Sequence, residues 1–245
     1  NPPVNPLSDG VRNGLYESLQ KAEDDKTVKG VVLTGKGRAF IAGADISEFG
    51  GNVEGKSLNE VFQKLEFCKK PVVAAINGIA LGGGLETALC CNYRIIDKSA
   101  IVGLPEVNLG LLPGGGGTQR LPRLAGPSEA LKMMLTGSHV PAQKALNLGI
   151  VNSISDDVVA ESIEFIKEVA EKTDDHPKVR DFNEKMMEAR GDDKVLLEAQ
   201  AMASKGRKGQ FAPGQIIKCV EAAINIDDFD EGLKKEGEYF LECLM

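Results

Sequence analysis

Residues 71–86 read PVVAAINGIALGGGLE, and this stretch decides the fold. It begins as an apolar run, passes through the glycines Gly82, Gly83 and Gly84, and continues as a helical pattern from about Leu85. A run that is apolar without strict alternation is typical of a strand covered on both faces, as in a parallel α/β sheet. The stretch therefore predicts a buried strand, a tight turn and a helix.

The same pattern of apolar runs and glycine-rich bends recurs along the first part of the chain. Short apolar runs between glycine-rich bends predict strands at residues 28–34, 72–76, 93–96, 101–103 and 150–154. After Asp156 the pattern becomes helical, and we expect helices over residues 156–172, 177–190, 192–205, 213–225 and 228–245. The chain is thus expected to be an α/β protein, with a core over residues 1–155 and an α-helical region over residues 156–245.

Composition narrows the class of protein. A chain of 245 residues, 42% of them hydrophobic, suits one large α/β domain, with or without a helical appendage. With 29 Lys and Arg against 36 Asp and Glu, the net charge of -7 argues against nucleic-acid and membrane-surface binding. Five cysteines without CxxC spacing argue against a disulfide framework, and no metal site is expected. The longest apolar run, residues 71–81, is too short to span a membrane.

Two acids, Glu86 and Glu106, each follow a bend marked by glycine or proline. A carboxylate beside backbone N–H groups suits acid/base chemistry on an activated acyl group, since the carboxylate moves protons while the N–H groups stabilise the developing oxyanion. The N–H of Gly83 is a candidate oxyanion donor. Structural alternatives stay open: Glu86 would also suit the dipole of a first helical turn, and Glu106 would be hydrated in a surface turn.

Two further glycine segments resemble phosphate-binding loops. Residues 30–37 nearly match a P-loop but carry Gly37 where a hydroxyl residue is needed, which excludes a nucleotide triphosphatase. What remains is a tight turn, either a plain connection or a place where Lys36 and Arg38 meet phosphates. Residues 114–117 form a glycine run that feeds a helical pattern near Thr118, where the glycines either line a cavity or simply start the helix, and the run lacks the dinucleotide fingerprint.

Other catalytic arrangements are poorly supported. The histidines, His139 and His176, lie in charged or turn-like contexts far from the glycine segments, where solvated side chains are expected. No G-x-S-x-G sequence is present, which removes the nucleophile elbow of the α/β-hydrolases.

Taken together, the motifs resemble the crotonase superfamily, specifically its enoyl-CoA hydratases. The resemblance rests on RAFIAGADI at residues 38–46, on residues 71–86, on GLPE at residues 103–106 and on LLPGGGGTQRLP at residues 111–122. Within the family, the chain looks most like the hydratase/isomerase half of peroxisomal-type multifunctional β-oxidation enzymes. That likeness rests on residues 1–5, 102–113, 231–236 and 240–241.

The resemblance implies a spiral of ββα units and an acyl-CoA whose thioester oxygen lies between the N–H groups of Ala44 and Gly83. It also implies that Glu86 assists the addition of water at C3 of a 2-enoyl-CoA, while Glu106 manages the proton at C2. The CoA moiety, which belongs to the substrate and is no separate cofactor, is expected along residues drawn from three segments: Arg38, Ala42, Asp45, Ile46, Gly82 and Gly114.

Alternatives to hydration follow from the same resemblance. They are Δ3-Δ2-enoyl-CoA isomerisation or another crotonase-type acyl-CoA reaction, and a non-catalytic acyl-CoA-binding or scaffold protein. The expected partner is an acyl-CoA thioester, without nucleic acid or membrane. The resemblance further implies either a homotrimer or a chain fused to a 3-hydroxyacyl-CoA dehydrogenase half, in the peroxisome or alternatively in the mitochondrial matrix or cytoplasm.

Overall fold

The computed structural model describes residues 3–45, 55–173 and 175–245. Its strands form two four-stranded sheets. The first sheet is parallel and has the order β1 (Val31–Thr34), β3 (Val72–Ile76), β5 (Tyr93–Asp97), β8 (Ser153–Ser155). The second has the order β2 (Ala39–Ile41), β4 (Ile79–Leu81), β6 (Ile101–Gly103), β7 (Val140–Pro141), and only β7 runs antiparallel to its neighbour.

From β1 to β6 successive strands alternate between the two sheets, so this part of the chain winds as a spiral. In the first sheet Val31 pairs with Val72 and Val73 pairs with Tyr93, while in the second Ile79 pairs with Ile101. Each turn therefore adds one strand to each sheet. This arrangement confirms the α/β spiral expected from the sequence.

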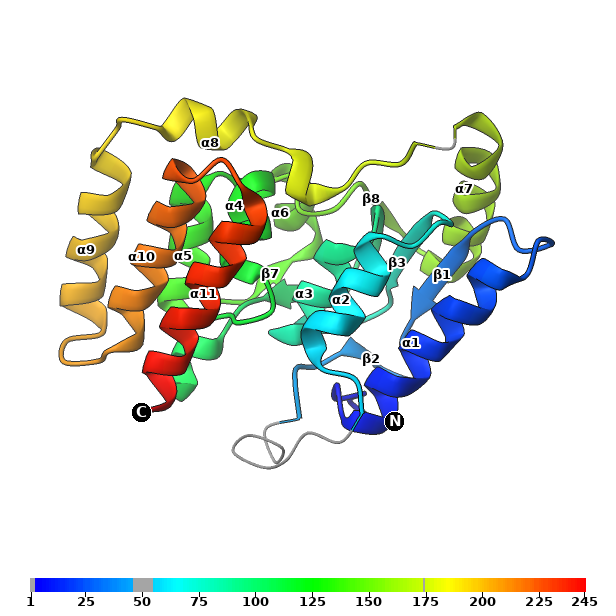
Figure 1. The fold of residues 1–245 in the computed structure, drawn as a ribbon, viewed down its shortest axis with the longest axis horizontal. Coiled ribbons are helices and arrows are strands. Elements are labelled where there is room, and N and C mark those ends of the chain that lie inside the picture. The colour runs from blue at the N-terminus through cyan, green and yellow to red at the C-terminus, as the bar shows by residue number, and fades with distance from the viewer. Residues whose placement is uncertain (1–2, 46–54, 174) are drawn as a thin grey trace.

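Helices connect and flank the turns of the spiral (Figure 1). The α-helices are α1 (Asp9–Asp24), α2 (Leu58–Glu66), α3 (Gly83–Cys90), α4 (Gly117–Ala125), α5 (Pro127–Thr136), α6 (Ala142–Asn147), α7 (Val158–Lys172), α8 (Glu184–Ala189), α9 (Lys194–Gly206), α10 (Ala212–Asn225) and α11 (Phe229–Leu244). Two short 3₁₀ helices are η2 (Glu106–Leu109) and η3 (Val179–Asp181). In Figure 1 the helices α9, α10 and α11 gather with α4 and α5 at the side of the molecule away from α1 and α7.

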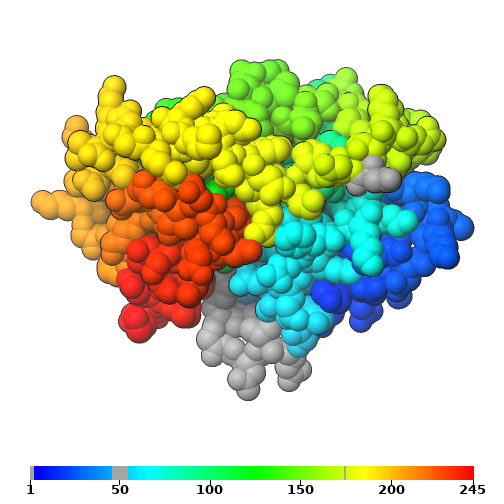
Figure 2. All heavy atoms as spheres, turned by 45° about the horizontal axis from the view of Figure 1, so that its top comes forward, coloured from blue at the N-terminus to red at the C-terminus, as the bar shows by residue number. Residues whose placement is uncertain are grey.

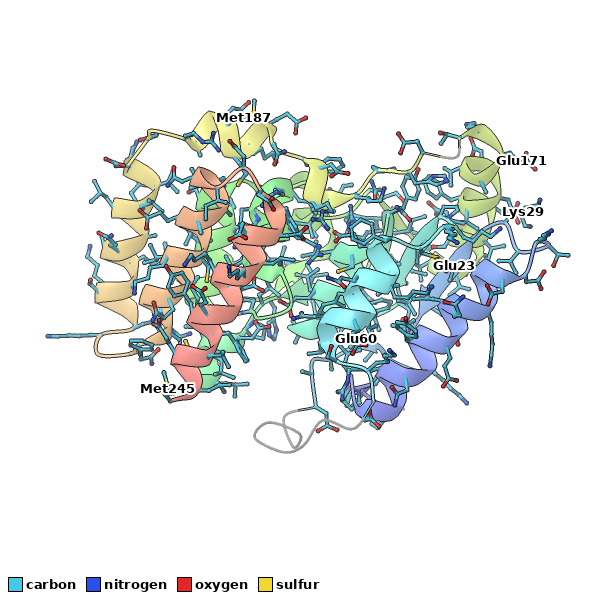
Figure 3. All side chains as sticks on the ribbon, in the orientation of Figure 1. Glu23, Lys29, Glu60, Glu171, Met187 and Met245 are labelled. Atoms are coloured by element: carbon cyan, nitrogen blue, oxygen red, sulfur yellow. The ribbon has the colours of Figure 1, made fainter. Side chains whose placement is uncertain are left out.

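The core follows from the apolar run of β3, all of whose residues are buried. On one face of the first sheet, Val73 and Ala75 pack with Val158 and Ile166 of α7. The opposite face belongs to the main core, which extends to Ile216 of α10. Glu171 on α7 and Lys29 near β1 are charged side chains that lie on the outside, as Figure 3 shows. Among the described residues, no helix combines the length and apolar character that a membrane span needs.

Most predicted elements are confirmed, with shifted ends at β1 and β8. The helix predicted over residues 177–190 is wrong. It divides into η3 and α8 because Phe182 has an extended backbone, while Arg180 is held by ion pairs to Glu66 and Asp230. Figure 2 shows this segment as a yellow band along one face of the molecule, between α7 and α9. The boundary predicted after residue 155 falls between β8 and α7, and the division into two parts stays a prediction.

Candidate active site

The N-terminus of α3 is built for close backbone approach. Gly82 has φ 54° and ψ -127°, a conformation that side chains of L-residues rarely adopt. A Cβ atom on Gly84 would lie only 1.9 Å from the carbonyl oxygen of Ile41 in β2. These two glycines therefore allow α3 to begin directly against the second sheet, with Glu86 in its first turn as predicted.

The carboxylate of Glu86 points into the protein and binds the glycine loop at residues 114–117. Its Oε1 accepts hydrogen bonds from the N–H of Gly115 at 2.8 Å and of Gly117 at 2.9 Å. Only 4% of the residue surface is exposed. Burial raises the pKa of Glu86, and the two N–H donors and the Arg120 guanidinium offset part of that rise. Glu86 is thus a buried acid with a fixed orientation.

Glu106, at the start of η2, faces the same region from another turn of the spiral. A Cβ atom on Gly82 would lie 3.0 Å from Oε1 of Glu106, and Oε2 is buried without a hydrogen-bond partner among the described residues. Burial first, and then repulsion from Glu86, raise the pKa of Glu106 well above its usual range. Of the alternatives left open by the sequence, the structure shows a buried carboxylate oxygen and not a hydrated surface acid.

The amides of Ala44 and Gly83 meet beside this pair of acids. A Cβ atom on Gly83 would lie 3.4 Å from the amide nitrogen of Ala44. Ala44 is fixed by a bridge to Leu7, whose N–H donates to the carbonyl of Gly43 at 2.9 Å. The N–H of Gly83 belongs to the first turn of α3, where amides have no intrahelical acceptor. The start of α3 thus lies close to both the Ala44 backbone and the carboxyl group of Glu106, which belong to other parts of the spiral.

The remaining predicted site residues lie at varying distances from this centre. Gly82 is part of it, whereas Arg38 is exposed at the entrance to β2. Ala42 and Asp45 are half-buried on either side of Ala44, and the N–H of Ala42 donates to the carbonyl of Val4. Ile46 lies outside the described residues. Gly114 is packed under α11, since a Cβ there would lie 2.6 Å from Phe240.

The turn before β2 is held internally by asparagines. Asn77 accepts from the N–H of Gly35 at 3.0 Å and donates to the carbonyl of Gly37, while Asn5 donates to the carbonyl of Lys36. The side chain of Lys36 is exposed, as is that of Arg38. The amide of Gly35 is therefore already occupied, and the two cations are the groups that this turn presents to solvent.

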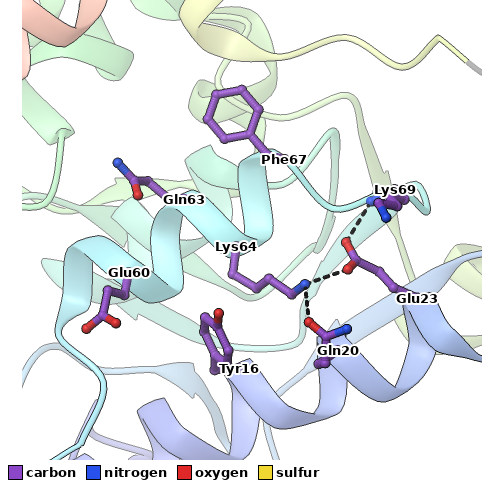
Figure 4. Close-up of a pocket in the computed structure, with 8 residues that line it drawn as sticks. All are labelled: Tyr16, Gln20, Glu23, Glu60, Gln63, Lys64, Phe67 and Lys69. Atoms are coloured by element: carbon purple, nitrogen blue, oxygen red, sulfur yellow. Dashed lines mark hydrogen bonds and ion pairs between the residues drawn. The ribbon is translucent and has the colours of Figure 1, made fainter.

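A surface groove of about 460 Å³ between α1 and α2 contains none of these residues (Figure 4). Its polar side chains bind one another, as Lys64 donates to both Gln20 and Glu23. The groove is a separate surface feature. Among the described residues, no cluster of His, Cys, Asp and Glu has the arrangement of a metal site.

Sequence reasoning missed Glu236 on α11, a third buried acid at this site. Its Oε1 accepts from the N–H of Gly116 at 2.6 Å, and its Oε2 accepts from the N–H of Thr118 at 3.1 Å. A signal was present: Phe229, Gly232, Glu236 and Phe240 follow helical spacing, which places an acid on an otherwise apolar helix face.

The ββα spiral with paired buried acids defines a crotonase-type fold and site. The sequence profile described as "Enoyl-CoA hydratase/isomerase" matches residues 1–212. The chain belongs to this family.

Similar proteins agree with that assignment. The chain is 41% identical over 239 residues to a peroxisomal bifunctional enzyme of Danio rerio, covering 97% of this chain and 33% of the relative. It is 40% identical over 261 residues to a fatty acid oxidation complex subunit alpha of Shewanella frigidimarina, covering 99% and 36%. The solved enoyl-CoA hydratase of Bacillus anthracis is 31% identical with a TM-score of 0.60, covering 96% of this chain and 80% of that chain.

These relatives confirm the likeness to multifunctional β-oxidation enzymes that the motifs indicated. The chain spans about a third of the length of the curated relatives it matches.

Proposed function

We propose that the protein is an enoyl-CoA hydratase, which adds water across the 2,3 double bond of 2-enoyl-CoA thioesters in fatty-acid β-oxidation. The observation that carries the proposal is the convergence of Glu86 and Glu106 beside Gly82 and Gly83. A pair of acids at one place can deliver the two halves of a water molecule to adjacent carbons.

The environments of the two acids support different roles. Glu86 is stabilised as a carboxylate by two N–H donors, whereas Glu106 has a buried oxygen that finds no hydrogen-bond partner among the described residues and is repelled by Glu86. Glu86 then takes a proton from water as the water oxygen bonds to C3, and the π electrons move toward the thioester carbonyl. Glu106 gives its proton to C2, which completes the addition, and the proton that Glu86 took from water then passes to Glu106 and restores the starting state.

The amides of Ala44 and Gly83 stabilise the negative charge that develops during the reaction. As C2 and the carbonyl acquire enolate character, negative charge develops on the thioester oxygen, and two fixed N–H donors stabilise that charge more than the ground state. Removing one such donor typically lowers the rate by about 10²–10³-fold. The reaction uses the CoA of its substrate, and no further cofactor is part of the proposal.

The test is loss of the ultraviolet absorbance of the enoyl thioester when protein is added to crotonyl-CoA. We expect turnover by the wild type, and a fall of roughly 10²–10⁴-fold in kcat for Glu106→Gln with nearly unchanged binding of butyryl-CoA. Glu164→Gln, an exposed acid on α7, is the matched control and should retain full activity. An unchanged rate in Glu106→Gln would remove Glu106 from the mechanism. Tight binding without turnover in the wild type would instead indicate the scaffold alternative.

Isomerisation of 3-enoyl-CoA to 2-enoyl-CoA is a second candidate, favoured by the buried Oε2 of Glu106, which has no hydrogen-bond partner in the described part of the chain. One acid suffices for this reaction, because it carries a proton between C2 and C4 without adding water. Glu86→Gln should then abolish hydration and spare the double-bond migration. Equal loss of both reactions would count against this side activity.

Arg38 and residues 42–46 are proposed to bind the CoA moiety, with the exposed side chain of Arg38 available to meet its phosphates.

We also propose a peroxisomal location, supported by the Danio rerio relative, although the Shewanella relative is named without a compartment. Fusion to a 3-hydroxyacyl-CoA dehydrogenase half is supported by the greater length of the relatives, and a homotrimer is the alternative. Light scattering on the purified chain and imaging of a tagged chain test these points.

A further inference from the structure

Glu236 lies on the buried face of α11, with 1% of its surface exposed. Besides accepting from Gly116 and Thr118 amides, its Oε2 lies 2.5 Å from the hydroxyl oxygen of Thr118. That hydroxyl also accepts a hydrogen bond from Nε2 of Gln119 at 2.9 Å. The buried carboxyl group of Glu236 therefore joins α11 to the glycine loop through several hydrogen bonds.

Glu86 and Glu236 bind alternate amides of the same loop. Glu86 accepts from Gly115 and Gly117, whereas Glu236 accepts from Gly116 and Thr118. The alternation depends on Gly116, whose left-handed backbone (φ 88°, ψ 8°) turns one peptide plane against the next. The loop is therefore clamped between α3 on one side and α11 on the other.

The clamp fixes the loop on both sides, so a shift on one side moves the other. Without Glu236, the amides of Gly116 and Thr118 would be buried without acceptors, and the loop would have to rotate to find new ones. Rotation of these peptide planes would withdraw the amides of Gly115 and Gly117 from Glu86. The carboxylate of Glu86 would then lose the two bonds that hold its orientation.

We propose that Glu236 is a positioning residue of the reaction centre. By holding the amides of Gly116 and Thr118, it directs the alternate loop amides at Glu86 and so fixes the orientation of the Glu86 carboxylate. This inference rests on the hydratase function proposed above. Glu236 is not a catalytic residue in this scheme, since it acts on the substrate only through the loop and Glu86.

The charge of Glu236 adds a second influence. Burial, followed by repulsion from Glu86, raises its pKa to about 8. The charged and titratable groups facing it are Glu86 on α3, Glu106 on η2, Arg120 on α4 and Cys219 on α10. Repulsion is mutual, so ionised Glu236 raises the proton affinity of both other acids.

The test compares Glu236→Gln with wild type over a range of pH. Glutamine keeps an oxygen for the Gly116 amide but replaces the second acceptor by an NH₂ group facing the Thr118 amide. We expect kcat for crotonyl-CoA to fall, by up to roughly 10²-fold, with a nearly unchanged KM. Because Glu236 is ionised mainly above about pH 8, loss of its repulsion should move the alkaline limb of the pH profile to lower pH and leave the acidic limb in place. A purely structural residue would lower the amount of active protein and leave the position of the profile unchanged.

Two further variants complete the experiment. Glu238→Gln removes an exposed acid of α11 that pairs with Lys235, and should leave kcat and the profile unchanged. Glu236→Asp keeps the charge but shortens the side chain; it should lower kcat while leaving the profile in place, and it serves if the glutamine variant does not fold.

The outcomes separate the two proposals. If the wild type does not hydrate crotonyl-CoA, the proposed function fails. If the wild type is active and Glu236→Gln, or Glu236→Asp in its place, matches it in kcat, the positioning role is overturned.

Discussion

The guanidinium of Arg120 on α4 grips both carboxylate oxygens of Glu66 on α2, through Nε at 3.0 Å and Nη2 at 2.9 Å. Both side chains are almost fully buried. The Nη1 of Arg120 also donates to the carbonyl of Gly115 at 3.3 Å. The pair therefore links α2 to the glycine loop through a buried contact.

Breaking this pair should destabilise the whole protein. Glu66→Gln leaves the charge of Arg120 buried without a matching carboxylate, and we expect a loss of about 3–5 kcal/mol in the free energy of unfolding. Urea unfolding followed by circular dichroism measures it. The exposed pair between Lys167 and Glu164 is the control, because Glu164→Gln should change stability little. Similar losses in both variants would show that burial does not determine the effect.

The space in front of the Ala44 amide can be tested with a methyl group. In Gly83→Ala the new Cβ would lie 3.0 Å from Cδ1 of Leu7 and 3.4 Å from the Ala44 nitrogen, where the thioester oxygen is proposed to bind. We expect kcat/KM for crotonyl-CoA to fall by roughly 10²-fold. Gly237→Ala, in open space on α11, should instead add up to about 1 kcal/mol of stability and leave turnover unchanged. Full activity in Gly83→Ala would exclude this position as the oxyanion site.

Gly116 is constrained by both backbone conformation and contact. A Cβ atom there would lie 1.9 Å from Nη1 of Arg120, in addition to the strain of a positive φ. Gly191 has a similar φ of 83° with nothing within 4 Å, so Gly191→Ala isolates the strain, at about 1–2 kcal/mol. We expect Gly116→Ala to lose clearly more stability, together with activity. Thermal unfolding and the hydration assay on both variants give the comparison, and equal losses would contradict a role for the Arg120 contact.

Stability should fall as pH rises through the titration of Glu236. The pKa of this group rises from 4.5 in its usual state to about 8 in the folded protein, so the folded state favours the protonated form. The stabilisation is present below about pH 4.5 and is lost as pH rises toward 8, at up to about 1.4 kcal/mol per pH unit. Denaturant unfolding at several pH values should show this decline in the wild type and in Glu238→Gln, and a shallower one in Glu236→Gln. Parallel curves for wild type and Glu236→Gln would contradict the assignment.

Local sequence was sufficient where local interactions determine the structure. The strand at residues 72–76 and the helix carrying Glu86 follow from an apolar run and a glycine triplet within one stretch, and both are confirmed. The start of α7 is equally local, because the side chain of Asp157 accepts the N–H of Ala160. Such features need no knowledge of distant parts of the chain.

The rest depends on partners that are remote in sequence. The three-residue strands β2 and β4 are too short to show a periodic pattern and exist because they pair with each other. The environment of Glu106 could not be decided until Gly82 and Glu86 were placed beside it. The helix predicted at residues 177–190 fails for the same reason, since the contacts of Arg180 with Glu66 and Asp230 override local helix propensity.

The two amides that donate to Glu236, those of Gly116 and Thr118, lie 120 and 118 positions earlier in the chain than Glu236 itself. A ribosome making about 5–20 residues per second therefore exposes the loop for roughly ten seconds before α11 emerges to meet it. In that interval a nascent chain can already have wound its spiral, yet the amides of Gly116 and Thr118 still lack their acceptor. Maturation of the reaction centre thus waits for α11 to be translated.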